Sequence, residues 1–121
     1  MIKADLLLDT RAILGEGPAW ESQSQRLYWV DITGKAVHVT NPATGSDRVI
    51  PMPCQVGTIA PRASGGAVVA TQRGLAFLDL STGALDWLCH PEADKPENRF
   101  NDGKCDPAGR FFAGTLHKDE K

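Results

Sequence analysis

A repeated order of short strand-like segments and turns constrains the fold of this chain more than any other feature. Runs of apolar and β-branched residues alternate with turn sequences, and the same order occurs twice around a Thr-Gly turn. The two Thr-Gly pairs, at 44–45 and 82–83, are 38 residues apart. A third unit begins at Phe100 and reaches its second strand-like run at 110–116. Four short strands per unit, at a period of about 40 residues, are typical of a β-propeller blade.

The local sequence signals indicate strands rather than helices. The runs between turns are rich in aromatic and β-branched residues, and no window of about 11 residues or more has a clear helical period. Turn clusters separate the runs, as at Asp106–Gly109, where Asp, Pro and Gly stand at the positions that a type I turn favours. We predict an all-β chain with blade 1 at about 17–52, blade 2 at about 55–90 and the start of blade 3 at about 99–116.

A single β-sandwich is the alternative architecture, because a chain of 121 residues would suit seven or eight strands. The recurrence of the units in the same order favours the propeller. A propeller needs at least four blades to close, whereas these residues supply about two and a half. We therefore expect residues 1–121 to form one incomplete propeller domain, the N-terminal portion of a larger protein.

The composition excludes several classes of partner. Thirteen Lys and Arg residues against fifteen Asp and Glu residues give a formal net charge of −2, and no basic cluster is interleaved with aromatic residues. Nucleic acid is therefore not an expected partner. No apolar run reaches membrane-spanning length or resembles a signal peptide, so we predict a cytoplasmic location without membrane contact. Three cysteines without a C-x-x-C spacing favour neither a disulfide framework nor a zinc knuckle.

The segment Leu14–Trp20 contains the first candidate functional residue, Glu16, which stands between two glycines. Flanking glycines leave the backbone free to direct the carboxylate, and Pro18 fixes the chain as it enters the strand. The innermost strand of a propeller blade begins at the central channel, where an oxygen ligand would suit Ca²⁺, Mg²⁺, Mn²⁺ or Zn²⁺. The alternative is a solvated loop glutamate.

The segment Asn98–Lys104 is the second candidate, because polar side chains gather there just before the inner strand of the third unit. Arg99 offers a planar fork of donors, Asn101 both a donor and an acceptor, and Asp102 a carboxylate. This mixture suits a polyhydroxylated or carboxylated small ligand. The alternative is a plain Asn-Asp-Gly turn.

Structural roles are the simpler expectation for several other residues. We expect the ring of His38 to face solvent, and Cys105 to pack as a small hydrophobic side chain. His117 follows a predicted strand and could approach the channel mouth. The three tryptophans are expected to pack between blades; they are Trp20, Trp29 and Trp87.

Taken together, five segments resemble the regucalcin (senescence marker protein)/gluconolactonase family. These segments are Leu14–Trp20, Arg26–Asp31, Ile59–Arg62, Asn98–Arg110 and Phe112–Thr115. The Leu-Gly-Glu-Gly-Pro and Arg-Phe-Asn-Asp-Gly-Lys sequences, in this order and about 80 residues apart, form a specific pair. The resemblance covers essentially the whole chain.

The resemblance implies a six-bladed propeller with one divalent metal ion in its central channel, which hydrolyses small-molecule sugar lactones such as gluconolactone. It implies that Glu16 is a metal ligand and that Arg99 and Asn101 bind substrate. The other metal ligands and the catalytic base would lie beyond Lys121, so this chain on its own is expected to be inactive. A calcium-binding or ligand-sensing propeller without catalytic activity is the alternative within the same family.

Two further expectations follow from the resemblance. A substrate-contacting acid is implied shortly after the Gly-Thr-Leu sequence, where both Asp119 and Glu120 lie. A strand within Ile2–Leu8 would complete the last blade and close the ring. Because that partner blade is absent from this sequence, the sheet edges are expected to favour aggregation or assembly with another chain.

Overall fold

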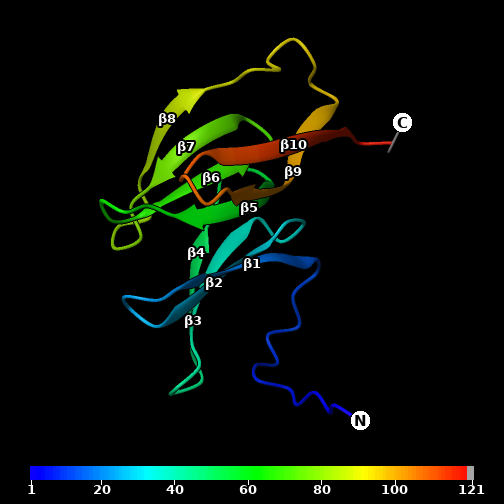
Figure 1. Cartoon of the computed structure of the whole chain (residues 1–121). Helices are drawn as coiled ribbons and strands as arrows, with labels where there is room; N and C mark the ends of the chain where they lie inside the picture. Colours follow the sequence, from blue (N-terminus) through cyan, green and yellow to red (C-terminus); the bar gives the residue numbers. More distant parts are fainter. Residues whose placement is uncertain (120–121) are drawn as a thin grey trace.

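The structure is a computed structural model that describes residues 1–119, and these residues form ten strands in three antiparallel sheets (Figure 1). The strands are β1 (Gly15–Glu21), β2 (Arg26–Asp31), β3 (Ala36–Asn41), β4 (Ser46–Pro51), β5 (Val56–Pro61), β6 (Ala67–Thr71), β7 (Gly74–Leu78), β8 (Leu85–Cys89), β9 (Asn98–Cys105) and β10 (Phe111–His117). Two sheets have four strands each, in the orders β1-β2-β3-β4 and β5-β6-β7-β8, and the third pairs β9 with β10. Within each sheet, strands that are consecutive in sequence are paired, and the three sheets do not close into a ring.

The all-β prediction agrees with this arrangement. Turns and bends connect the strands of residues 1–119, and the segment between β8 and β9 forms turns without helix. No helix among the described residues is long and apolar enough to cross a membrane. The predicted strand within residues 2–8 is not observed, because this segment has no strand pairing.

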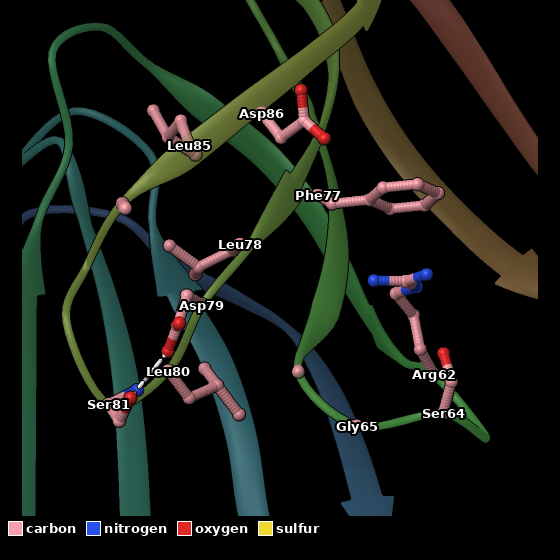
Figure 2. A pocket seen from close by; sticks show the side chains of 12 residues that line it. Arg62, Ser64, Gly65, Phe77, Leu78, Asp79, Leu80, Ser81, Leu85 and Asp86 are labelled. Carbon is pink, nitrogen blue, oxygen red and sulfur yellow. Dashed lines mark hydrogen bonds between the residues drawn. The ribbon is translucent and has the colours of Figure 1, made fainter.

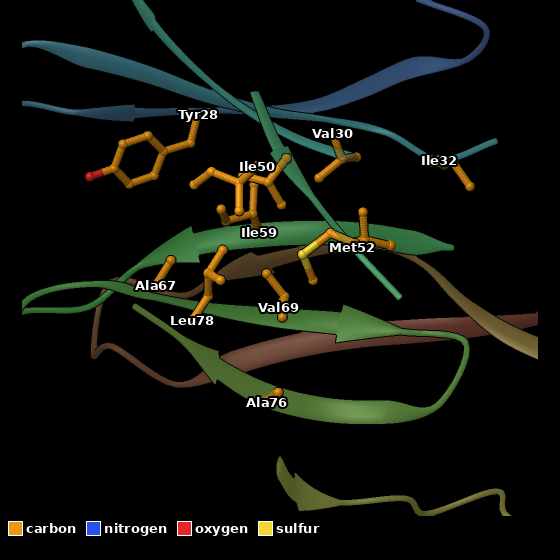
Figure 3. Close-up of a cluster of buried hydrophobic side chains, with 12 residues drawn as sticks. Tyr28, Val30, Ile32, Ile50, Met52, Ile59, Ala67, Val69, Ala76 and Leu78 are labelled. Carbon is orange, nitrogen blue, oxygen red and sulfur yellow. The ribbon is translucent and has the colours of Figure 1, made fainter. Parts of the chain in front are cut away.

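The main core lies between the first and second sheets, where apolar side chains from facing strands interdigitate (Figure 3). Alternation along β2 directs Tyr28 and Val30 into this core, and β5 packs directly against β1 and β2. The buried residues of this core are Tyr28, Val30, Ile32, Val37, Ile50, Met52, Val56, Ile59, Ala67, Val69, Ala76 and Leu78. This layer fixes the position of the second sheet relative to the first.

The expectation that His38 faces solvent is wrong, because the opposite face of the first sheet is covered. His38 is only 5% exposed, and its ring stacks on Trp29 with centroids 3.8 Å apart. Its Nδ1 lies 2.6 Å from Asp47 Oδ2, and the Thr40 hydroxyl donates to the other Asp47 oxygen at 2.7 Å. The N-terminal segment lies on this face, since Leu7 lines a hollow together with Trp29 and Thr40.

Two other side-chain expectations are not met within residues 1–119. Trp20 and Trp87 are 48% and 43% exposed, so they do not pack between sheets within residues 1–119. Cys105 is exposed as well and lines a groove. Trp29 interacts within its own sheet, since its Nε1 donates a hydrogen bond to Thr40 Oγ1 at 2.9 Å.

The carboxylate of Asp31, at the end of β2, fastens the N-terminal segment to the first sheet. Its oxygens accept the backbone N–H groups of Ile13 and Leu14 at 3.0 Å each and that of Gly34 at 2.9 Å. Burial opposes ionisation of this carboxyl, but the N–H donors outweigh burial and lower the pKa of Asp31.

We expect Asp31→Asn to reduce the free energy of unfolding at neutral pH by about 1–2 kcal/mol, because an amide cannot accept all three hydrogen bonds. The folded-state pKa lies below the unfolded value of about 3.9, so this contribution is complete above the unfolded pKa and is lost as the pH falls through the folded one. Urea unfolding at pH 7 and pH 3 measures the difference, which should shrink at the lower pH. Asp94→Asn, in an exposed turn, is the control; equal losses in both variants would contradict the role given to Asp31.

Candidate active-site groove

The first strands of the three sheets, β1, β5 and β9, lie side by side and run in the same direction. The Thr58 hydroxyl donates to the Gly103 carbonyl at 3.2 Å, and one residue earlier Gly57 faces the carbonyls of Phe100 and Asn101. A Cβ on Gly57 would lie 2.3 Å from the Phe100 oxygen, so β5 and β9 approach each other as closely as a glycine allows. On the other side, Gly17 packs against Gly57 and Thr58.

Each of these three inner strands has a β-bulge at a corresponding level. In β1 two residues, Gly17 and Pro18, lie opposite Trp29 alone. In β5 the extra residue is Gly57, between the pairs of Val56 and Thr58 with β6. In β9, Asn101 and Asp102 lie opposite a single residue of β10. Bulges redirect side chains and are common next to active sites, and two of the three, those in β1 and β9, lie in the segments that contain the candidate residues.

Glu16 directly precedes the bulge in β1, and its side chain is exposed. Gly17 has φ of +63°, a left-handed conformation that glycine adopts without strain. The backbone freedom predicted for the glycines beside Glu16 is therefore used at this position. The left-handed conformation of Gly17 lets the strand bend, and Glu16 borders a groove of about 660 Å³.

The groove runs between the three inner strands and places two carboxylates, those of Glu16 and Asp102, on one surface. Its lining residues are Glu16, Gly17, Pro18, Ala19, Trp20, Ile59, Ala60, Pro61, Asp102, Gly103, Lys104 and Cys105. Both carboxylates come from bulged segments of different sheets. The groove therefore brings together residues of the two segments that the sequence singled out as candidates.

Arg99 and Asn101 form a hydrogen-bonded pair at the start of β9. The Arg99 Nη1 donates to the side-chain oxygen of Asn101 at 3.1 Å and to the carbonyl oxygen of Phe100 at 3.1 Å. Both side chains are half-buried, and Phe100 between them is buried with 9% exposure. The guanidinium is thereby held in one orientation, and its Nε and Nη2 make no hydrogen bond within residues 1–119.

The structure does not place all the candidate residues in one hollow. Arg99 lines two smaller hollows beside the groove, whereas Glu16 and Asp102 line the groove itself. Among residues 1–119, no group of three His, Cys, Asp or Glu side chains is arranged to hold a metal ion. Divalent cations such as Ca²⁺ prefer six or more oxygen ligands. The described residues therefore do not make up a complete metal site.

The segment between β8 and β9 is tied to the site by Glu92, a residue that the sequence did not single out. Its carboxylate accepts the side-chain amide of Asn98 at 2.8 Å and the hydroxyl of Thr115 at 3.1 Å. The hydrogen bond from Asn98 is the main reason that the pKa of Glu92 is lowered. The side-chain amide of Asn98 thus helps to hold the segment before Arg99 in place.

The acid expected after the Gly-Thr-Leu sequence falls at the end of the described residues. Asp119 is exposed, and its backbone N–H donates to His117 Nδ1 at 3.1 Å. Glu120, the other candidate, lies outside the described residues. The structure thus places a carboxylate close to His117, beyond the end of β10.

Figure 2 shows another hollow, of about 630 Å³, at the turns that connect β5 to β6 and β7 to β8. In it the guanidinium of Arg62 lies 3.5 Å from the centre of the Phe77 ring. Because β5 ends at Pro61, this hollow lies at the opposite end of the inner strands from Glu16 and Arg99. It is therefore separate from the candidate site.

Successive antiparallel sheets with their first strands side by side are the arrangement of a β-propeller, and comparison with solved structures supports this class. The chain superimposes with a TM-score of 0.83 on a calcium-binding protein, regucalcin, from Agrobacterium tumefaciens. The two are 31% identical, and the match covers 88% of this chain but 36% of the other. The predicted fold, part of a β-propeller, is confirmed.

Residues 14–121 match the SMP-30/gluconolactonase/LRE-like region, and the chain belongs to this family. Regucalcin from Xenopus laevis is 37% identical over 118 residues, which are 98% of this chain and 40% of that protein. A 6-deoxy-6-sulfogluconolactonase from Pseudomonas putida is 38% identical over 105 residues, 87% of this chain and 36% of that protein. The predicted family resemblance is confirmed, and lactone hydrolysis occurs within the family. The chain spans about 40% of the length of the curated relatives it matches.

Proposed function

We propose that this chain carries one metal ligand, Glu16, and a substrate-binding pair, Arg99 and Asn101, of a divalent-metal-dependent sugar lactone hydrolase. The observation that carries the proposal is the hydrogen bond between Arg99 and Asn101, at a bulge in an inner strand of a propeller whose family includes a lactone hydrolase. In this proposal the three sheets are blade 1, blade 2 and the start of blade 3.

The chemistry assigned to these residues is recognition of the lactone. A guanidinium already fixed by two carbonyl oxygens can direct its remaining N–H groups at the ring and carbonyl oxygens of the substrate. Developing negative charge on those oxygens would be stabilised by the same donors. Asn101 adds an amide donor and acceptor that suit sugar hydroxyl groups. No residue of 1–119 is assigned as the catalytic base.

A divalent metal, when bound, would polarise the lactone carbonyl and lower the pKa of a bound water. Glu16 would be the contribution of this chain to such a site, with Asp102 the nearest further carboxylate in the same groove. Because the described residues do not complete the site, we assign no step of the reaction to the metal.

Removal of metal tests the proposal. We expect EDTA to abolish hydrolysis of glucono-delta-lactone by the product of the whole reading frame that encodes this chain. Addition of Ca²⁺, Zn²⁺, Mn²⁺ or Mg²⁺ to the dialysed protein should restore it, because the metal would polarise the carbonyl that water attacks. A pH-stat assay measures the acid released. Full activity in EDTA, or no activity with any of the four ions, would contradict the proposal.

A calcium-binding propeller without catalytic activity is the second candidate. It is favoured by the similarity to a solved structure that is described as a calcium-binding protein. Isothermal titration of the same gene product with Ca²⁺ separates the two. Binding without lactone turnover supports the second candidate, and turnover that depends on the bound ion supports the first.

A further inference from the structure

The strongest unassigned feature is a polar hollow of about 260 Å³ between the second and third sheets. It is formed where β5 and β9 begin, beside the substrate-binding pair, and Arg99 is part of its wall. Its lining residues are Gln55, Gln72, Pro96, Glu97, Asn98, Arg99, Leu116 and Lys118. We propose that this hollow is a subsite for the hydroxyl-bearing end of a neutral sugar lactone, with Gln55 and Gln72 determining specificity. The inference rests on the proposed function, because Arg99 is the residue that the two sites share.

The hollow contains polar groups that have no partner among residues 1–119. The side-chain amides of Gln55 and Gln72 make no hydrogen bond within this part of the chain, and Arg99 uses only Nη1. Each glutamine amide offers two donors and one acceptor oxygen, which match the hydroxyl groups of a sugar. A ligand held by Arg99 at one end would meet these amides at the other.

The walls of the hollow are held together by backbone hydrogen bonds. The N–H of Gln72, after β6, donates to the carbonyl of Gln55, before β5, at 2.8 Å. On the opposite wall the N–H of Lys118 donates to the carbonyl of Glu97 at 2.8 Å. The two glutamines therefore stand next to each other on adjoining backbone, with the side chain of Gln55 half-buried and that of Gln72 exposed to an incoming ligand.

The charges in the hollow indicate a neutral ligand rather than an anionic one. The Lys118 ammonium is paired with the Glu97 carboxylate, and this hydrogen bond is the main reason that the pKa of Glu97 is lowered. The Arg99 guanidinium keeps its charge, but in the proposed function its remaining N–H groups bind the ring and carbonyl oxygens of the lactone and not its hydroxyl-bearing end. The hollow thus has no free ammonium group for a sulfonate or phosphate, and selection depends on hydroxyl groups.

Kinetics of glutamine variants test the inference in the product of the whole reading frame. We expect Gln55→Leu with Gln72→Leu to raise KM for glucono-delta-lactone about tenfold and to leave kcat within about twofold, since hydrogen bonds to a remote hydroxyl bind substrate and transition state alike. Delta-valerolactone has the same ring without hydroxyl groups, so its KM should not change. Gln23→Leu, in the exposed turn after β1, is the matched control. Equal effects on both lactones, or no difference from Gln23→Leu, would overturn the inference.

A binding experiment on the 121-residue chain keeps the inference separate from the proposed function. In ¹⁵N spectra, titration with the neutral polyol glucitol should shift the side-chain amide signals of Gln55 and Gln72 and leave those of Gln23 unchanged. This result would support the subsite even if the gene product hydrolysed no lactone, in which case the proposed function alone would fail. Unmoved Gln55 and Gln72 signals, or tighter binding of a sulfonate analogue than of glucitol, would overturn it.

Discussion

Glu16→Gln is expected to lower kcat/KM for sugar lactones, and the affinity for the divalent ion, by about 100-fold or more in the product of the whole reading frame. The carboxylate is exposed at the groove, and the amide that replaces it keeps the shape of the side chain without its charge. A hard cation loses both the charge and one good oxygen ligand. Isothermal titration with Ca²⁺ and Mn²⁺ measures the affinity, and the pH-stat assay measures turnover.

Glu16→Gln should leave the stability of the fold unchanged. Substitution of an exposed side chain usually changes the free energy of unfolding by less than about 0.5 kcal/mol, so the variant should unfold like the wild type. Glu21→Gln, at the other end of the same strand, is the control for metal binding. The carboxylate of Glu21 accepts hydrogen bonds from Gln23 and Ser24, so its loss affects the turn and not the groove. Unchanged metal affinity in Glu16→Gln would remove Glu16 from the site.

The sequence repeat predicted the fold because the same turn chemistry occurs at equivalent places. The two Thr-Gly turns, 38 residues apart in sequence, have the same geometry: Gly45 N–H donates to the Asn41 carbonyl and Gly83 N–H to the Asp79 carbonyl, each at 2.8 Å. Gly45 and Gly83 also have φ values of +75° and +77°. Turn type and strand alternation are local properties, so they can be read without knowledge of the tertiary structure.

The errors concern properties that depend on packing between segments. Alternation along β3 places His38 on the face of its sheet that points away from the main core, but alternation does not predict whether another segment covers that face. Cys105 alternates within a strand in the same way, yet its side of β9 borders an open groove. The role of Glu92 could not be predicted either, since its partners Asn98 and Thr115 come from two different strands.

The candidate site was predicted in composition but not in arrangement. Polar residues near the starts of β1 and β9 marked both segments, and the Arg99–Asn101 pair is close in sequence and in space. Apart from the glycines in β1, the sequence pattern does not indicate the bulges that direct these side chains. The separation of Arg99 from the groove that Glu16 lines follows from the packing of sheets against one another, which the sequence pattern does not specify.

Gly57→Ala is expected to reduce the free energy of unfolding of this chain by about 3 kcal/mol, near the upper end of the usual cost of overpacking. The new methyl group would meet backbone atoms, at 2.3 Å from the Phe100 oxygen and 2.5 Å from the Asn101 oxygen. Backbone cannot move aside as a flexible side chain can, so β9 must shift away from β5. Since Arg99 donates to that same Phe100 oxygen, its guanidinium should move as well. Urea unfolding measures the loss, and ¹⁵N spectra report the Arg99 Nε and Asn101 amide signals.

Gly114→Ala is the matched control, because it adds the same methyl group in β10 opposite the bulge of β9, where no atom lies within 4 Å. It should leave stability unchanged or raise it by about 0.4–1 kcal/mol, since alanine restricts the unfolded chain. The contrast between the two variants isolates steric contact from the general effect of replacing glycine. If Gly57→Ala were as stable as Gly114→Ala, the two inner strands would have room to separate, and the close approach of β5 to β9 would not be what holds Arg99 in place.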